Sequence, residues 1–193
     1  MDKTRCSWVN DDPLYIKYHD EEWGIPIYDD QQLFELLSLE GAQAGLSWIT
    51  ILKRRLGYRE AFANFDIEKV SQFDEAKVQE LLCNEYIIRH ELKIRSVIKN
   101  AQAIKAIKVE YGSFSSFVWG FVDHTPIINN WSHHEEVPAY TEESTRMSKA
   151  LKKYGFSFVG PTICYAFMQV AGLVNDHTKA CYLYQQVGRT GIK

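Results

Sequence analysis

Apolar residues recur at three- and four-residue spacing along most of this chain, which is the pattern of amphipathic helices. The longest such segment covers 89–111, where Ile94, Val97, Ala101 and Ile104 share one helical face. No segment shows a convincing alternation of apolar and polar residues, which a half-buried strand would require. The pattern therefore predicts an all-α protein without internal repeats.

Residues that start and stop helices divide this pattern into segments. Asp12 followed by Pro13 predicts an N-cap and a first helical position. Asp30, Asp66 and Asp74 each precede an apolar-periodic run and are predicted to be caps. We expect a short helix from 13 to about 23, then helices over 30–42 and 47–56, two short ones after Asp66 and Asp74, then 89–111, a short aromatic-rich helix within 111–121, a loop over 123–143, and helices over 144–154 and 161–171.

The length of 193 residues suits one domain, or one domain in two lobes. An aromatic content of 13% suits a large core or a stacking site. Four cysteines do not suggest a disulfide scaffold at this length. The first residues lack the apolar core of a signal peptide, and the longest apolar stretch, near 163–174, is too short to span a bilayer. We therefore expect a cytoplasmic protein that does not bind a membrane.

The net charge of −3 argues mildly against a nucleic-acid partner, but the charges are unevenly distributed. Residues 1–43 hold ten acids and three bases, whereas 89–108 hold six bases and one acid. Residues 146–153 hold four bases and no acid. One face can therefore be locally positive. The alternative is that each basic run is simply a solvated helix face.

Two cysteine–histidine pairs lie at opposite ends of the chain: Cys6 with His19, and His177 with Cys181. The second pair has i, i+4 spacing, so on a helix both side chains share one face. Two thiolates and two imidazoles form a closed tetrahedral set for a structural Zn²⁺. The alternative is ordinary buried cysteines and hydrogen-bonded histidines, because the spacing matches no familiar zinc finger. The remaining two cysteines lie in apolar runs and are expected in the core: Cys83 and Cys164.

Glu40 is the acid that helical periodicity singles out. It follows Leu36 and Leu37 by four and three residues, so on a continuous helix it lies on or beside the apolar face. A carboxylate there must be paired, protonated or facing a cavity. The alternative is a frayed helix end that lets Glu40 reach water. The other acids of this helix are expected to be ordinary cap or surface groups: Asp29, Asp30 and Glu35.

Large aromatic residues gather in the first quarter of the chain: Trp8, Tyr15, Tyr18, Trp23 and Trp48. Rings combined with one carboxylate suit a flat cationic ligand, because ring faces stack on it and attract its charge while the acid accepts hydrogen bonds. Ordinary core packing is the alternative, since large aromatics dominate cores.

The segment 149–167 is typical of two helices joined by a tight hairpin. Gly155 ends the first helix, Gly160 allows a tight turn and Pro161 starts the second. A glycine-bearing turn at a helix N-terminus exposes N–H groups that can bind a phosphate, and Lys152 and Lys153 stand just before it. A simple αα-hairpin without such a role is the alternative.

Four stretches together make the chain resemble the bacterial 3-methyladenine DNA glycosylase I family, constitutive enzymes of alkylation repair. They are CSWVNDDPLYIKYHDEEWGIP, LFELLSLEGAQAGLSWITILKRR, IIRHELKIRSVIKNAQA and SKALKKYGFSFVGPTICYAFMQVAGLVNDH. They are distributed over nearly the whole chain, and the first, second and last are highly specific.

The resemblance implies an all-α, helix-hairpin-helix glycosylase fold with a cleft between two lobes, in a single domain over 1–193 whose helix-hairpin-helix lies at about 144–172. It implies one structural zinc that joins the terminal segments. Family motifs match the following residues here: as zinc ligands Cys6, His19, His177 and Cys181; as base pocket Trp8, Tyr15, Tyr18, Trp23, Glu40 and Trp48; as DNA contacts Leu46 and the hairpin residues 156–162, among them Phe158, Gly160 and Thr162. Lys152 and Lys153, which stand just before this hairpin, are added as candidate DNA contacts because of their charge.

The chain departs from the wider helix-hairpin-helix superfamily at two positions. An acid follows the hairpin in LVNDHT at a shorter interval than the superfamily's catalytic aspartate, so Asp176 is given no chemical role. Position 162 is Thr rather than the lysine nucleophile of lyases, so we expect a monofunctional hydrolase.

We therefore expect hydrolysis of the N-glycosidic bond of 3-methyladenine in double-stranded alkylated DNA, by a monomer that releases the free base. Glu40 is the candidate catalytic residue, and whether it acts chemically or only in binding stays open. Two rival functions are a zinc hydrolase, which requires an open coordination position, and a non-catalytic zinc-stapled DNA-binding module.

Overall fold

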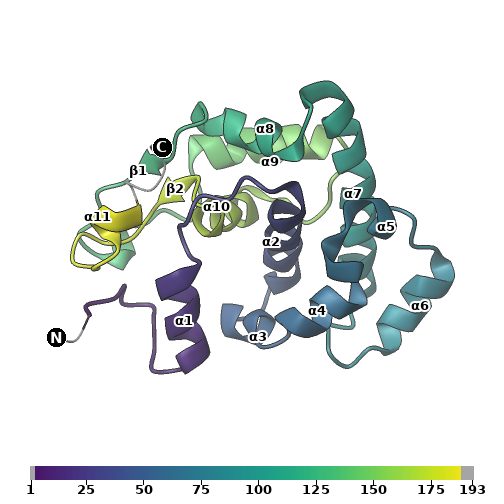
Figure 1. The fold of residues 1–193 in the computed structure, drawn as a ribbon, viewed down its shortest axis with the longest axis horizontal. Coiled ribbons are helices and arrows are strands. Elements are labelled where there is room, and N and C mark those ends of the chain that lie inside the picture. The colour runs from purple at the N-terminus through teal and green to yellow at the C-terminus, as the bar shows by residue number, and fades with distance from the viewer. Residues whose placement is uncertain (1–2, 188–193) are drawn as a thin grey trace.

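The computed structural model describes residues 3–187, and helices dominate this range, as predicted (Figure 1). The α-helices are α1 Pro13–Glu21, α2 Asp30–Gln43, α3 Trp48–Leu52, α4 Arg55–Ala61, α5 Ile67–Val70, α6 Glu75–Cys83, α7 Glu91–Tyr111, α8 Phe114–Trp119, α9 Glu142–Lys153, α10 Pro161–Val170 and α11 Tyr184–Val187. Short 3₁₀ turns cover Ala63–Phe65, Gly120–Val122 and His134–Glu136. The remaining residues of the single-domain prediction, 1–2 and 188–193, lie outside the described part.

Helix α2 lies between two groups of helices (Figure 1). It packs against α10 on one side and against α7 and α8 on the other, and its leucines and Phe34 are almost fully buried. Helices α4 to α7 lie together at one end of the molecule, while α1 and the C-terminal segment lie at the other. The central position of α2 brings the two groups into contact along one buried helix.

Most predicted caps are confirmed. The side chains of Asp12, Asp66 and Asp74 accept hydrogen bonds from backbone N–H groups of α1, α5 and α6. The prediction for α2 was wrong by one residue, because Asp29 is the N-cap and accepts from the N–H of Gln32. The carboxylate of Asp30 instead accepts from the N–H of Ser115 in α8.

Three predicted helical features differ in the structure. The helix expected over 47–56 is two helices, α3 and α4, because the chain turns at Lys53 and Arg54. His177 and Cys181 are not on a helix, since 176–178 is irregular and turns and a bend cover 179–183. The residues of positive φ in the hairpin are Gly155, with φ 91°, and Phe158, with φ 55°, whereas Gly160 has φ −62°.

Two further expectations are wrong. The segment 123–143 is not only loop, because β1 Ile127–Ile128 pairs in parallel with β2 Val174–Asn175. Two-residue strands are too short to show alternation in a sequence. Cys83 is exposed at the end of α6, while Cys164 is buried as expected.

No helix among residues 3–187 is both long enough and apolar enough to cross a membrane.

Gly172 allows the chain leaving α10 to pass close to the connection between α1 and α2. Its φ is +72°, and a Cβ there would lie 2.4 Å from the nitrogen of Pro26 and 2.5 Å from the carbonyl carbon of Ile25. Both contacts are with backbone, which cannot move aside as a side chain can.

We therefore predict that Gly172→Ala lowers the free energy of unfolding by about 2 kcal/mol or more, from the positive φ and the backbone overlap together. Gly120→Ala is the matched control, because a Cβ at Gly120 meets nothing within 4 Å. Its effect should stay within about 0.5 kcal/mol. Denaturant unfolding of both variants measures this, and an equal effect in the two would contradict the close approach at Gly172.

Candidate functional site

A cavity of about 250 Å³ opens between the N-terminal aromatic residues and α10. It is lined by Trp8, Tyr15, Tyr18, Trp23, Glu40, Gln43, Trp48, His134, Ala166 and Gln169. The structure thus brings together all six residues that the sequence analysis assigned to one pocket. A larger hollow of about 620 Å³ lies along the first half of α2, but its charged groups pair with each other, as Arg55 does with Glu22 and Glu35.

Glu40 lies in the last turns of α2 and is 5% exposed. No side chain or backbone N–H among the described residues donates a hydrogen bond to it. Burial without a partner disfavours the carboxylate form, so it raises the pKa of Glu40 to about 8. The empty cavity therefore holds a neutral acid near pH 7, and a cation that enters would favour its ionised form.

Glu35, five residues earlier on α2, is also buried, which contradicts the prediction of a surface acid. Its carboxylate accepts from the guanidinium groups of Arg55 and Arg59 in α4. Glu35 is thus a structural ion-pair residue, whereas Glu40 is available to a ligand.

The aromatic walls of the cavity contact each other mainly through ring edges. Trp8 lies 5.3 Å from Tyr15 and 5.0 Å from Trp23 between ring centroids, in edge-on arrangements. Tyr18 and Trp48 are 5.4 Å apart and tilted by 47°. The indole N–H of Trp48 is buried without a partner among the described residues. Ring surface is therefore available to a flat guest, whereas the indole N–H of Trp48 is enclosed.

A second hollow of about 200 Å³ adjoins the cavity and shares Glu40, Gln43 and Ala166 with it. Its other lining residues include Leu46 and Thr162, both of which the resemblance assigned to DNA contact. Leu46 is 40% exposed, on the loop that follows α2. The ammonium of Lys93 in α7 fixes this loop, because it donates to the carbonyl oxygens of Ala42 and Ala44 at 2.9 and 2.6 Å.

The hairpin between α9 and α10 carries the other residues assigned to DNA contact. Lys152 and Lys153 are exposed in the last turn of α9, and Gly160 is the N-cap of α10 without a side-chain cap. Asn100 in α7 holds the hairpin, since its amide exchanges hydrogen bonds with the backbone N–H and carbonyl of Ser157. Phe158 is half-buried, and its Cβ would lie 3.3 Å from a Cβ at Gly41.

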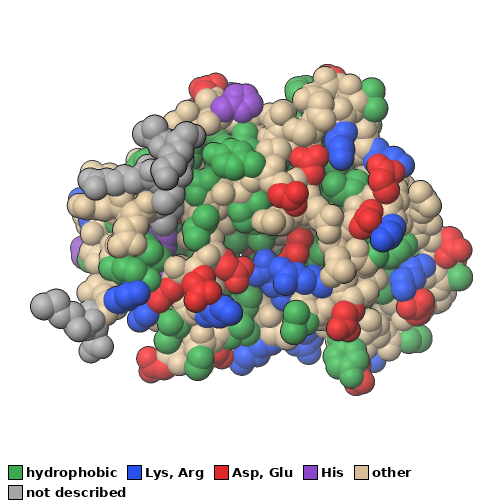
Figure 2. All heavy atoms as spheres, viewed as in Figure 1, with side chains coloured by type: hydrophobic (Ala, Val, Ile, Leu, Met, Phe, Trp, Pro, Cys, Tyr) green, Lys and Arg blue, Asp and Glu red, His purple; other side chains and the backbone are tan. Residues whose placement is uncertain are grey.

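The surface charges of the described residues are mixed in sign. On the face shown in Figure 2, basic side chains lie beside acidic ones rather than forming one positive surface. In the basic run 89–108, Arg95 pairs with Glu75 and Glu91, and Lys105 pairs with Glu68. Within residues 3–187, no acid pairs with Lys152 or Lys153.

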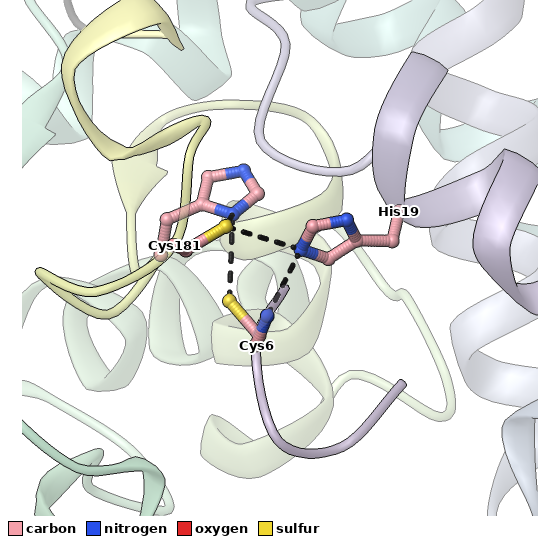
Figure 3. A group of neighbouring side chains, drawn as sticks. Cys6, His19 and Cys181 are labelled. Carbon is pink, nitrogen blue, oxygen red and sulfur yellow. Dashed lines mark hydrogen bonds between the residues drawn. The ribbon is translucent and has the colours of Figure 1, made fainter. Parts of the chain in front are cut away.

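A buried cluster of four side chains that could hold a metal ion joins the two ends of the described chain. One ligand atom from each of Cys6, His19, His177 and Cys181 lies within 4.8 Å of the others. Figure 3 shows Cys6, His19 and Cys181 converging from separate segments, with Sγ of Cys181 3.5 Å from Nε2 of His19. Although His177 and Cys181 are not on a helix, the turns between them place Sγ of Cys181 3.5 Å from Nδ1 of His177.

The groups behind the histidines fix which ring nitrogen faces the cluster. Nδ1 of His19 lies 2.8 Å from Oδ1 of Asp20, and Nε2 of His177 lies 3.2 Å from the carbonyl oxygen of Trp23. Each acceptor takes one ring N–H and leaves the other nitrogen for a metal. Arg5 in turn pairs with Asp20 and holds the pKa of this carboxyl well below its usual range.

The two cysteines differ in acidity. The thiol of Cys6, which donates a hydrogen bond to the sulfur of Cys181, lowers the pKa of Cys181, so a thiolate forms there first. Because two thiols and two correctly oriented imidazoles meet in a buried cluster, the residues present fit a tetrahedral metal ion.

The cluster and the cavity share their supports. Trp8 follows Cys6 by two residues, and its ring is 5.3 Å from that of His19. Trp23 offers its carbonyl oxygen to His177 and its ring to the cavity. Two of the cavity's aromatic walls are therefore held by the residues that form the cluster.

Four cavity residues were missed from the sequence. Gln43 lies three residues after Glu40 on α2, so helical spacing alone indicated it. Ala166 and Gln169 follow Thr162 at helical spacing on α10, and this periodicity was an available signal as well. His134 comes from a short turn in a long loop, and nothing local in the sequence marks it.

Comparisons with known proteins agree over almost the whole chain. The family model of methyladenine glycosylases matches residues 8–184. The chain is 50% identical over 178 residues to a DNA-3-methyladenine glycosylase of Haemophilus influenzae, covering 92% of this chain and 96% of the relative.

Solved structures give the same result. A crystal structure of a 3-methyladenine DNA glycosylase I superposes with a TM-score of 0.91 at 51% identity, covering 93% of this chain and 98% of that one. A tyrosine-to-phenylalanine variant of a 3-methyladenine DNA glycosylase I, in complex with 3-methyladenine, superposes with a TM-score of 0.90 at 39% identity, covering 92% and 96%.

The raised pKa of Glu40 predicts a pH-dependent cost in stability. Below about pH 4.5 the carboxyl is protonated in both folded and unfolded states. Between pH 4.5 and 8 the unfolded chain ionises while the folded chain does not, so the free energy of unfolding falls as pH rises and levels off above about 8.

Glu40→Gln removes this pH-dependent loss of stability. The variant should match the wild type near pH 4.5 and be more stable at pH 8.5, by on the order of 4 kcal/mol for a pKa change of this size. Denaturant unfolding of both proteins across this pH range measures the difference. A constant difference at all pH values would show that the Glu40 carboxyl is not held neutral in the fold.

Proposed function

The chain belongs to the methyladenine glycosylase family, and from this premise we propose that it excises 3-methyladenine from alkylated DNA by hydrolysing the N-glycosidic bond. The observation that carries the proposal is the unpaired, buried carboxyl of Glu40 inside an aromatic cavity. Such a carboxyl is stabilised by a flat cation, and adenine methylated at N3 in DNA is one.

Binding then selects the lesion. The base leaves the duplex at a cost of a few kcal/mol, which is smaller when the base is damaged. Trp8, Tyr18 and Trp48 stack on the cationic base, and Glu40 gives up its proton and accepts hydrogen bonds from the base edge. A neutral base cannot compensate the buried carboxylate, so an undamaged purine is bound less well.

The chemical step breaks the bond between the sugar carbon C1′ and N9 of the base. The electron pair of that bond moves onto the base and cancels its positive charge, while the oxygen of a water bonds to C1′ and releases a proton. Because the leaving base is already cationic, the reaction needs no separate acid. Glu40 acts here by binding the base in this geometry.

We place the DNA over the hollow that joins Leu46 to Thr162. Leu46 enters the gap left by the extruded base, while Gly160, Thr162 and the N–H groups at the start of α10 bind the backbone phosphate. Lys152 and Lys153 supply the counter-charge, and Phe158 braces the hairpin against α2. We propose that the protein acts on double-stranded DNA as a monomer.

We infer that the metal of the cluster is zinc, one ion per chain. Two thiolates and two imidazoles are the ligands that Zn²⁺ prefers, and four protein ligands leave no position for a reacting water. Cys6 and His19 together with His177 and Cys181 would therefore hold the fold, and the hydrolysis uses none of them.

Release of base from methylated DNA tests the excision. Duplex DNA treated with dimethyl sulfate is incubated with the enzyme, and freed bases are separated by chromatography. The wild type should release 3-methyladenine, and Glu40→Gln should lower kcat/KM on the order of 100-fold, because a charge-assisted hydrogen bond and the counter-charge are lost.

Glu60→Gln is the matched control, since Glu60 is exposed and lines no part of the cavity. It should keep the wild-type rate. DNA retained without any freed base would instead indicate a binding module, and full activity of Glu40→Gln would remove Glu40 from the site.

Metal content and thermal stability test whether the cluster binds a zinc ion that stabilises the fold. The wild type should contain about one zinc per chain by elemental analysis, and Cys181→Ser should lose it and lower Tm by roughly 10 °C, which corresponds to about 3 kcal/mol. Cys83→Ser is the control, because Cys83 is an exposed cysteine outside the cluster. A metal-free wild type as stable as the zinc-bound protein would refute the proposal that zinc holds the terminal segments together.

A further inference from the structure

Asp176 is a fully enclosed carboxylate that the reaction described above does not use. It is 2% exposed, and within residues 3–187 no Lys or Arg pairs with it. Each of its oxygens instead accepts two hydrogen bonds from neutral donors. Asn129 and Trp131 donate to Oδ1 at 2.6 and 2.8 Å. Tyr165 and Gln169 donate to Oδ2 at 2.6 and 2.8 Å.

One of these donors lies in the wall of the base cavity. Gln169 projects from α10, is half-buried, and lines the cavity that Glu40 and the aromatic residues form. The bond from its Nε2 to Asp176 fixes the amide orientation, because a carboxylate only accepts hydrogen bonds and so the NH₂ side must face it. The carbonyl oxygen Oε1 is then the end of the amide left for a guest.

Oε1 of Gln169 remains unused within the protein. No described residue donates to it, and it is not among the buried polar atoms that lack a partner, so solvent or a guest can reach it. The cavity therefore presents two acceptors from different helices, the carboxyl of Glu40 on α2 and the amide oxygen of Gln169 on α10.

We propose that Gln169 is a specificity residue that accepts a hydrogen bond from the exocyclic amino group of the methylated adenine, and that Asp176 is the positioning residue that keeps its amide in the accepting orientation. This inference rests on the proposed function.

The chemistry of the two methylated purines gives the discrimination. The amino group at C6 of adenine has two N–H bonds, so two acceptors can each take one. Guanine has a carbonyl oxygen at C6, which would face the acceptor of Gln169 without a hydrogen between them. A site built to accept from a donor rejects the analogue that lacks it, because the polar groups are left unpaired.

The fold explains why Asp176 can hold this position. It follows β2, which pairs with β1, and the N–H of Asn129 donates to the carbonyl oxygen of Asn175. The strand pair thus fixes the position of Asp176 relative to the loop that carries two of its donors, Asn129 and Trp131. Tyr165 lies one turn before Gln169 on α10, and its hydroxyl also donates to Asp176, so Asp176 is fixed relative to this helix as well.

The test compares the affinities of two free bases, 3-methyladenine and 3-methylguanine. Three tryptophans line the cavity, so quenching of tryptophan fluorescence reports binding. Gln169→Leu removes the acceptor. The Kd for 3-methyladenine should rise about tenfold, as expected for one hydrogen bond, while the Kd for 3-methylguanine should fall or stay unchanged, because the acceptor that faces its C6 carbonyl is gone.

Asp176→Asn tests the positioning role. An amide at 176 offers an NH₂ group to Gln169, whose amide can then turn and present its own NH₂ to the cavity. The Kd ratio of the two bases should shift in the same direction as in Gln169→Leu, with 3-methylguanine bound more tightly than by the wild type. The ratio is independent of how much of the variant is folded.

Gln102→Leu is the control, because the amide of Gln102 also donates to a protein oxygen, that of Ser71, but lies outside the cavity. Its Kd ratio should equal that of the wild type. Equal changes in both Kd values for Gln169→Leu, or no change, would overturn the proposal, and Gln169→Leu alone decides if Asp176→Asn does not fold. A wild type that frees no 3-methyladenine from DNA would instead refute the proposed function.

Discussion

The cavity depends on one constraint, the buried meeting of Cys6 and His19 with His177 and Cys181. Residues 3–12 contain no helix, so little regular structure holds the segment that carries Trp8. A backbone bond from Tyr182 to Thr4 and the pair of Arg5 with Asp20 are the other ties near it. A metal ion bound by these four side chains would offset the entropy of closing a loop that spans most of the chain. Loss of the ion would release an aromatic wall of the cavity as well as the terminal segments.

The aromatic wall of the cavity sets the protonation state of Glu40. A buried carboxyl to which no described residue donates a hydrogen bond stays neutral near pH 7. Ionising it costs free energy in the unliganded protein, and a cation bound beside it offsets that cost. The same low polarity strengthens stacking and ion pairing inside the cavity. Selection of a charged lesion therefore follows from the absence of a partner for Glu40, and the absence costs stability in the unliganded enzyme.

Local physics explains which parts of the fold were predictable from the sequence. The caps at Asp12, Asp66 and Asp74 were correct because a cap is decided within three residues. The break at Lys53 and the parallel pair of β1 with β2 were not predicted, because tertiary packing decides both. The six pocket residues meet as expected. Their positions in the sequence suggested the grouping of rings and acid, but on that basis alone core packing of the rings was the favoured interpretation, and the family resemblance decided for a pocket.

Glu35 and Glu40 show what burial can and cannot indicate. Both lie on α2, and they are 6% and 5% exposed. Periodicity could not separate them, because the partners of Glu35 are Arg55 and Arg59, which only the fold brings near. A buried acid with two guanidinium partners is consistent with its surroundings and needs no ligand. A buried acid without a partner among the described residues breaks the rule that buried polar groups are hydrogen-bonded, and such local violations concentrate where a protein binds something. Pairing, rather than burial, is therefore the property that identifies Glu40 as the functional acid of this helix.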